Sequence, residues 1–73
     1  MKILKNGDVY FNLSVLDAYY FLDYNNSLNL GSGDNQRELE LDQNKYQEFK
    51  TKLFDFLINS EIVMDISTYV LKG

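Results

Sequence analysis

The sequence predicts an α+β domain, with a small antiparallel sheet of four or five strands and one amphipathic helix packed on one face. Short segments alternate apolar and polar residues and are separated by turns rich in Gly and Asn. A further segment, residues 44–58, has its apolar residues at helical spacing. The 73 residues contain no linker or repeat, so we expect a single domain over 1–73.

The first predicted element is a hairpin. Asn6-Gly7 lies between two apolar–polar stretches, and both residues accept the positive φ that a two-residue hairpin loop requires. This loop places Lys5 opposite Asp8. The residues then expected to point inward are Val9, Phe11 and Leu13.

Residues 14–24 fit two interpretations. Ser14 and Asp17 have the spacing of an N-terminal helix cap, but the helix would be apolar almost all round, which so small a domain cannot bury. We therefore favour a strand. Its wholly apolar face holds Leu16, Ala18, Tyr20, Leu22 and Tyr24. Its mixed face holds Asp17, Tyr19, Phe21 and Asp23.

A hairpin and a further strand are predicted next. A three-residue loop at 25–27 pairs Tyr24 with Leu28 and keeps the apolar faces in register. Residues 31–35 form a flexible loop, and residues 37–41 alternate as a strand.

One helix and a last strand complete the fold. Asn44 is the better N-cap, with Asp42 as the alternative, and Asn59 ends the helix. The helical stripe is Tyr46, Phe49, Leu53, Phe56 and Leu57. Residues 62–71 alternate as the final strand.

The composition argues against catalysis. The chain has no His and no Cys, which removes imidazole as a general base and thiolate as a nucleophile, together with the usual ligands for zinc, copper, haem and iron–sulfur centres. Ser14 and Ser32 have no His to activate them. We expect no enzyme activity, no cofactor and no metal.

Two loops share features with known ligand-binding loops. Residues spaced as calcium ligands begin at Asp23, but Leu28 stands where the loop needs Gly, Asp34 takes the place of the bidentate Glu, and no helix follows. Residues 31–33 resemble a phosphate loop in glycine content only. Both segments are better interpreted as polar hairpin loops.

The net charge of the chain limits the classes of partner that it can bind. The net charge of −4 disfavours direct contact with nucleic acid or an anionic membrane. Lys2 and Lys5 interrupt the first residues before a signal-peptide core develops, so we expect a cytoplasmic protein.

Two groups of residues are candidate partner-binding sites. Glu38, Glu40 and Asp42 lie on one side of a strand, about 6.6 Å apart at strand rise, and can imitate a row of phosphates. A solvated strand face is the more ordinary explanation. The second group is the mixed face of the 14–24 segment, which is either an interface with aromatic anchors between acids or a further layer of core.

The sequence thus favours a non-catalytic acidic protein that inhibits or modulates a basic, nucleic-acid-handling protein. Eleven of the 73 residues are Phe or Tyr, more than a small core encloses, so some are expected at an interface. A composition suited to AT-rich codons is typical of phage-encoded inhibitors of host defence, anti-CRISPR proteins among them. The alternative is a homo-oligomeric phage or plasmid assembly protein, for which a homodimer is one form.

Overall fold

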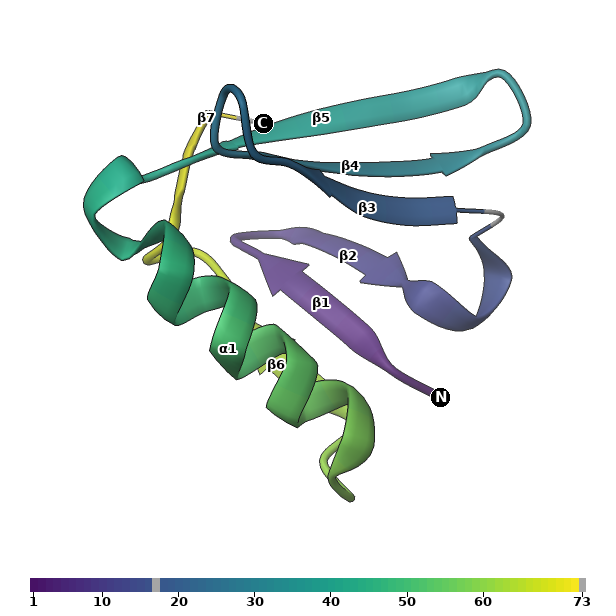
Figure 1. Ribbon diagram of the computed structural model, residues 1–73. Coiled ribbons are helices and arrows are strands. Elements are labelled where there is room, and N and C mark those ends of the chain that lie inside the picture. The colour runs from purple at the N-terminus through teal and green to yellow at the C-terminus, as the bar shows by residue number, and fades with distance from the viewer. Residues whose placement is uncertain (17, 73) are drawn as a thin grey trace.

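The computed structural model describes residues 1–16 and 18–72, and this part of the chain forms two sheets and one long helix (Figure 1). The three-stranded sheet has the order β2-β1-β6, and the four-stranded sheet has the order β3-β4-β5-β7. The strands are β1 Ile3–Asn6, β2 Val9–Asn12, β3 Ala18–Leu22, β4 Ser27–Ser32, β5 Asn35–Leu41, β6 Val63–Asp65 and β7 Val70–Lys72. The helix α1 spans Tyr46–Ile58, and two short 3₁₀ turns are η1 Leu13–Val15 and η2 Gln43–Lys45.

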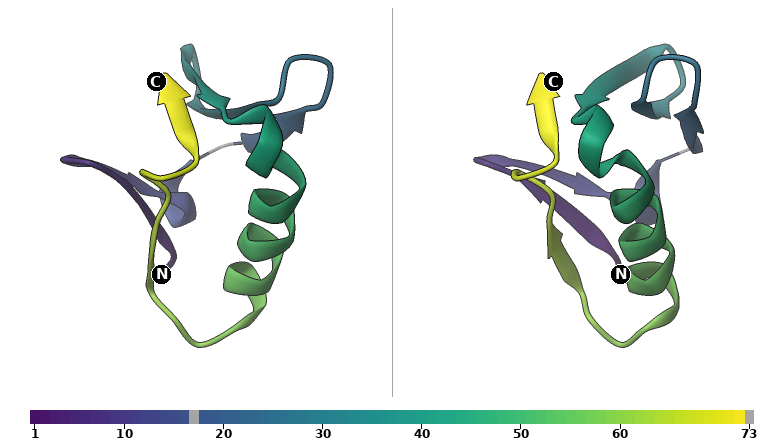
Figure 2. Two further views of the ribbon diagram at one scale, coloured as in Figure 1. Left: turned by 90° about the vertical axis from the view of Figure 1, so that its left-hand side faces the viewer. Right: turned by 60° about the vertical axis from the view of Figure 1, so that its left-hand side comes forward.

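The predicted α+β class is confirmed, while the strands are divided between two sheets. All pairs in the four-stranded sheet are antiparallel. In the other sheet β1 is antiparallel to β2 and parallel to β6. Figure 2 shows α1 facing β1 and β6, with the four-stranded sheet across one end of both. The core fills the space between them and draws on both sheets and the helix: Leu4, Leu13, Leu28, Leu30, Leu39, Leu41, Tyr46, Phe49, Leu53, Phe56 and Ile66.

Helix α1 forms as its apolar stripe predicts. Four residues of the stripe are buried, and Leu57 packs against the core at its edge. The cap differs from both predicted residues: Lys45 precedes α1 and forms no side-chain cap hydrogen bond. Asp42, in extended conformation directly after β5, instead caps η2, where its side chain accepts a hydrogen bond from the Asn44 backbone N–H at 3.0 Å. Asn44 lies inside η2 and is not the cap, because the chain turns two residues earlier than predicted.

Both two-residue hairpin loops are Gly-Asp pairs with the glycine first. Gly7 and Gly33 have φ of 61° and 60°, as a turn with glycine at its first central position requires. The first loop is therefore Gly7-Asp8 and pairs Asn6 with Val9, so the predicted pairing of Lys5 with Asp8 is wrong. Val9, expected inward, is exposed beside this turn, whereas Phe11 packs on the core and Leu13 is buried.

The segment predicted as a flexible loop is part of a continuous hairpin. β4 extends to Ser32 and β5 begins at Asn35, and these two residues pair across the turn. Gly31 lies inside β4 beneath the Gln36 side chain, where an added Cβ would clash at 2.3 Å.

Residues 18–22 form the favoured strand, but its register differs from the prediction. The loop to β4 has four residues, 23–26, with Asn26 at a φ of 54°, and Phe21 pairs with Leu28. Because this offset differs from the predicted one by an odd number of residues, the faces are exchanged. Phe21, on the mixed face, points to the core, while Tyr20 and Tyr24 are exposed.

The predicted last strand is divided. β6 joins the three-stranded sheet, β7 joins the four-stranded sheet, and Ile66 is fully buried between them. The chain turns where Asp65 Oδ1 accepts a hydrogen bond from the Ser67 backbone N–H at 2.9 Å and the Tyr69 N–H bonds to the Ile66 carbonyl.

Candidate functional site

An apolar groove of about 250 Å³ lies between β3 and α1. Tyr19 and Phe21 contribute from the strand, and Leu53, Phe54 and Leu57 contribute from the helix. Phe54 is 65% exposed and Tyr19 is 40% exposed, whereas Leu53 is buried in the groove floor. The groove is smaller than the roughly 300–1,000 Å³ of small-molecule sites but larger than the ~150 Å³ that holds one benzene ring, so it suits one or two apolar side chains.

The two predicted aromatic anchors have different environments. Phe21 packs edge-on against Tyr46 and Phe49, with ring centroids 5.8 and 6.0 Å apart. It therefore belongs mainly to the core, as one of the two interpretations of this face anticipated. Tyr19 remains available at the surface. Phe54, which sequence reasoning placed with no site, supplies the most exposed ring of the groove, and its position just off the buried helical stripe was the available signal.

Asp23, the predicted acid at the end of this face, is held by two donors from the helix end nearest β3. The Tyr46 hydroxyl donates to Asp23 Oδ1, and Lys50 Nζ lies 3.0 Å from the same oxygen. These contacts, the Tyr46 hydrogen bond first, hold the pKa of Asp23 below its usual value. Burial and the bond to Asp23 raise the pKa of Tyr46, which stays protonated. Lys50 also lies over the Phe21 and Tyr46 rings, so this end of the groove is fixed in place.

Glu38 and Glu40 project on the outer face of the four-stranded sheet, away from the core, and both are exposed. Glu38 accepts a hydrogen bond from Asn25 Nδ2 at 3.2 Å, and Glu40 lies opposite Lys72 in the register. Neither forms an ion pair within the part of the chain that the structure describes. Two of the three predicted carboxylates thus form an open acidic pair.

Asp42, one of the two remaining predicted site residues, has a structural role. Asp42 caps the turn into the helix, and its backbone N–H bonds to the Tyr69 carbonyl at 2.8 Å. Both bonds stabilise the fold. Asp17 lies outside the described residues.

The backbone of β3 carries a further feature of the site. The Leu41 N–H bonds to the Asn26 carbonyl at 2.9 Å, which continues the β4–β5 ladder by one pair. Hydrogen-bonded and non-bonded pairs alternate along an antiparallel ladder. Leu28 therefore directs its backbone groups to β5, and the next residue, Asn29, directs its own to β3.

Asn29 pairs with Tyr20, so Tyr20 is bonded to β4. Its neighbours Tyr19 and Phe21 then direct their N–H and C=O groups to the other side of β3, where the described sheet has no further strand. The groove thus lies along an open strand edge that presents main-chain donors and acceptors.

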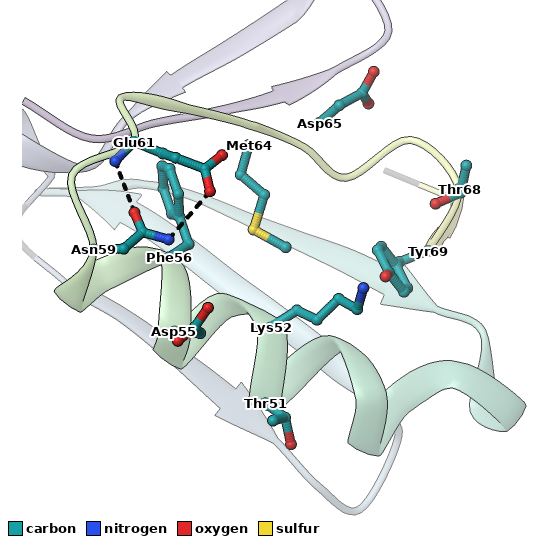
Figure 3. Close-up of a pocket in the computed structure, with 10 residues that line it drawn as sticks. All are labelled: Thr51, Lys52, Asp55, Phe56, Asn59, Glu61, Met64, Asp65, Thr68 and Tyr69. Atoms are coloured by element: carbon teal, nitrogen blue, oxygen red, sulfur yellow. Dashed lines mark hydrogen bonds between the residues drawn. The ribbon is translucent and has the colours of Figure 1, made fainter.

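A second, polar groove of about 550 Å³ lies between α1 and the segment 61–69 (Figure 3). Phe56, Met64 and Tyr69 supply its apolar surface, and its charged side chains are Lys52, Asp55, Glu61 and Asp65. The Asn59 side chain bonds to Glu61 twice, because its Oδ1 accepts from the Glu61 backbone N–H at 2.8 Å and its Nδ2 donates to Glu61 Oε1 at 3.3 Å. These bonds brace the helix end. Among residues 1–16 and 18–72, no three Asp or Glu side chains lie close enough together to hold a metal ion.

The residues spaced as calcium ligands are not brought together as a site. Asn25 Oδ1 accepts the Ser27 hydroxyl at 2.7 Å, and Asp23 is bound to Tyr46 and Lys50. These oxygens belong to the hairpin loop itself.

Comparison of the chain with protein-family models, curated proteins and solved structures gave no match. In the part of the chain that is described, no helix has the length and apolar character needed to cross a membrane.

Proposed function

We propose that this chain is a non-catalytic binding protein whose partner is another protein with a basic, nucleic-acid-handling surface. One observation carries the proposal: an apolar groove with exposed rings lies along the β3 edge, and Tyr20 of that groove shares the outer face of the sheet, through Asn29, with the open pair of carboxylates on β5. A docking surface needs both features, since aromatic anchors supply most of the binding energy and charge supplies orientation.

The aromatic part of this surface exposes more ring area to water than a surface without a partner needs. Five of the eleven aromatic side chains are at least 40% exposed, namely Tyr10, Tyr19, Tyr20, Tyr24 and Phe54. Tyr19, Tyr20 and Phe54 line one groove. Burial of such rings against a partner removes apolar surface from water and leaves the tyrosine hydroxyls free to bond at the rim.

The acidic part selects the partner by charge. Glu38 and Glu40 carry no ion pair among the described residues, and the net charge of the chain is −4. A Lys- and Arg-rich groove is attracted to such a face, and its occupation displaces phosphate from that groove. Inhibition of nucleic-acid binding is therefore the proposed effect. The codon-related composition, which suits phage-encoded inhibitors of host defence, supports the same class.

Affinity capture with matched baits tests the proposal. Immobilised wild type, Glu38→Gln/Glu40→Gln and Phe54→Ala are each incubated with one bacterial lysate, and proteins retained by wild type but lost with either variant are purified. We expect a nucleic-acid-binding protein that releases its nucleic acid when the wild-type chain is added in excess. A captured protein that keeps its nucleic acid contradicts the proposal, as does retention that is identical for all three baits.

Self-assembly through the β3 edge is the competing function, because an open, uncharged strand also pairs with its own copy. Analytical ultracentrifugation of the wild-type chain separates the two. The binding proposal expects a monomer near 8.6 kDa that forms a complex with its partner.

A further inference from the structure

We infer that the β3 edge binds an extended segment of the partner as an additional strand, in which a basic residue stands two positions from an apolar one. This inference rests on the proposed function and specifies its binding mode. An added strand completes the sheet with main-chain hydrogen bonds, and alternate side chains then enter one groove.

The main-chain groups needed for such pairing are in place. Tyr19 and Phe21 direct their N–H and C=O groups outward, because hydrogen-bonded and non-bonded pairs alternate along the ladder from β5 through β4 to β3. An incoming strand pairs with these two residues, and its side chains opposite them lie on the same face as Tyr19 and Phe21. That face opens on Phe54 and Leu57 of α1.

The volume and lining of the groove indicate that the partner segment places an apolar side chain in it. About 250 Å³ accommodates one or two aliphatic or aromatic side chains, and the lining is mostly apolar. Lys50 supplies the charged group that lines this groove, and it is already paired with Asp23 at 3.0 Å. A polar side chain entering here would lose water without a partner.

The position of Asp23 indicates where the partner segment carries its basic residue. Asp23 is the first residue of the turn after β3, and its contacts with Tyr46 and Lys50 place its side chain on the helix side, as for Phe21. A bound strand that continues past the end of β3 therefore brings to Asp23 the residue two positions from the one opposite Phe21. Tyr46 and Lys50 both bond to Oδ1 of Asp23, which leaves Oδ2 toward solvent on a side chain that is 70% exposed. A Lys or Arg opposite Asp23 can reach this oxygen, whereas an acidic residue there would be repelled.

A random linear peptide library displayed on phage tests this binding mode without knowledge of the natural partner. The wild-type chain is the immobilised target, and enriched peptides are synthesised. We expect sequences with a Lys or Arg two positions from an apolar residue. Phe54→Ala should weaken their binding at least tenfold, and Asp23→Asn should weaken it several-fold. Tyr10→Ala, an exposed ring on the other sheet, is the matched control and should leave binding unchanged.

Amide hydrogen exchange supplies the readout specific to strand addition. Bound peptide should slow exchange of the Tyr19 and Phe21 N–H groups relative to the free chain. Absence of enriched peptides, binding without this protection, or a free chain whose own dimer already protects both amides would overturn the inference. Because capture of a basic protein through Glu38 and Glu40 can succeed when peptide selection fails, failure of the binding mode is distinguishable from failure of the function.

Discussion

At the scale of single residues, the best-defined interaction in the candidate site is the contact of Asp23 with Tyr46 and Lys50. It joins the end of β3 to the first two turns of α1 and so fixes one end of the groove. The pKa of Asp23 is lower in the folded chain than its ordinary value of 3.8. The resulting stabilisation is therefore present above that value and is lost as the pH falls through the lower, folded pKa.

Substitution of Tyr46 by Phe removes the main cause of this shift. We expect the pKa of Asp23 to rise toward 3.8 while remaining below it, because Lys50 still lies beside the carboxylate. NMR titration of the Asp23 side-chain carboxyl carbon measures this directly. Tyr20→Phe is the control, since the Tyr20 hydroxyl accepts from Asn29 at 2.7 Å. An Asp23 titration curve unaltered by Tyr46→Phe would refute the assignment.

At the scale of elements, periodicity predicted the helix and most strands but not their registers. The helical stripe needed no partner to be recognised, because Tyr46, Phe49, Leu53 and Phe56 repeat at helical spacing. The β3–β4 offset was missed because three-residue and four-residue loops are equally compatible with the polar run at 23–27. Packing of Phe21 against the helix, a tertiary contact, selects the observed register.

The segment predicted as the last strand also shows that alternation does not report which sheet a strand joins. Alternation continues from 62 to 71 across the turn after Ile66, so the pattern gave no signal that the chain leaves one sheet for the other. Of the candidate site, the sequence named Tyr19, Asp23, Glu38 and Glu40 as candidates, with a core layer left open for the first two, and the structure leaves all four exposed. The prediction missed Phe54, because a single exposed ring on a helix is common and becomes informative only beside β3.

Two substitutions on α1 test the division between core and groove. Phe49 is fully buried, so Phe49→Ala should cost about 3–5 kcal/mol of unfolding free energy through lost burial and the cavity left behind. Phe54 is 65% exposed, and Phe54→Ala should change the same quantity by less than about 1 kcal/mol. Urea denaturation followed by circular dichroism measures both. Equal destabilisation by the two substitutions would mean that Phe54 belongs to the core.

At the scale of the whole molecule, the alternation of apolar and polar residues could not predict that the strands form two sheets. Alternation reports which face of a strand is apolar and does not report its neighbours, so the parallel pairing of β1 with β6 follows only from the folded chain. The two sheets and α1 share one core, and within the described residues no further strand pairs with the β3 edge of the four-stranded sheet.

Metal dependence is a property of the whole fold that is readily measured. Because the loop oxygens of Asp23, Asn25 and Ser27 bond to neighbouring groups, calcium has no assembled site to stabilise. We expect the melting temperature to be the same in excess chelator and in millimolar calcium, since a ligand that binds only the folded chain must raise it. A calcium-dependent rise of several degrees would show that this loop rearranges to bind the ion.

The association rate with the captured partner tests the central claim most directly. It is measured at low and high salt for wild type and for Glu38→Gln/Glu40→Gln, with Glu61→Gln, an exposed acid remote in sequence from this sheet, as the control. Attraction between unlike charges accelerates encounter and is screened by salt. We predict that the double variant associates several-fold more slowly at low salt and depends less steeply on salt, while the control matches wild type. Equal association rates for wild type and the double variant at low salt would contradict recognition of a basic partner through this face.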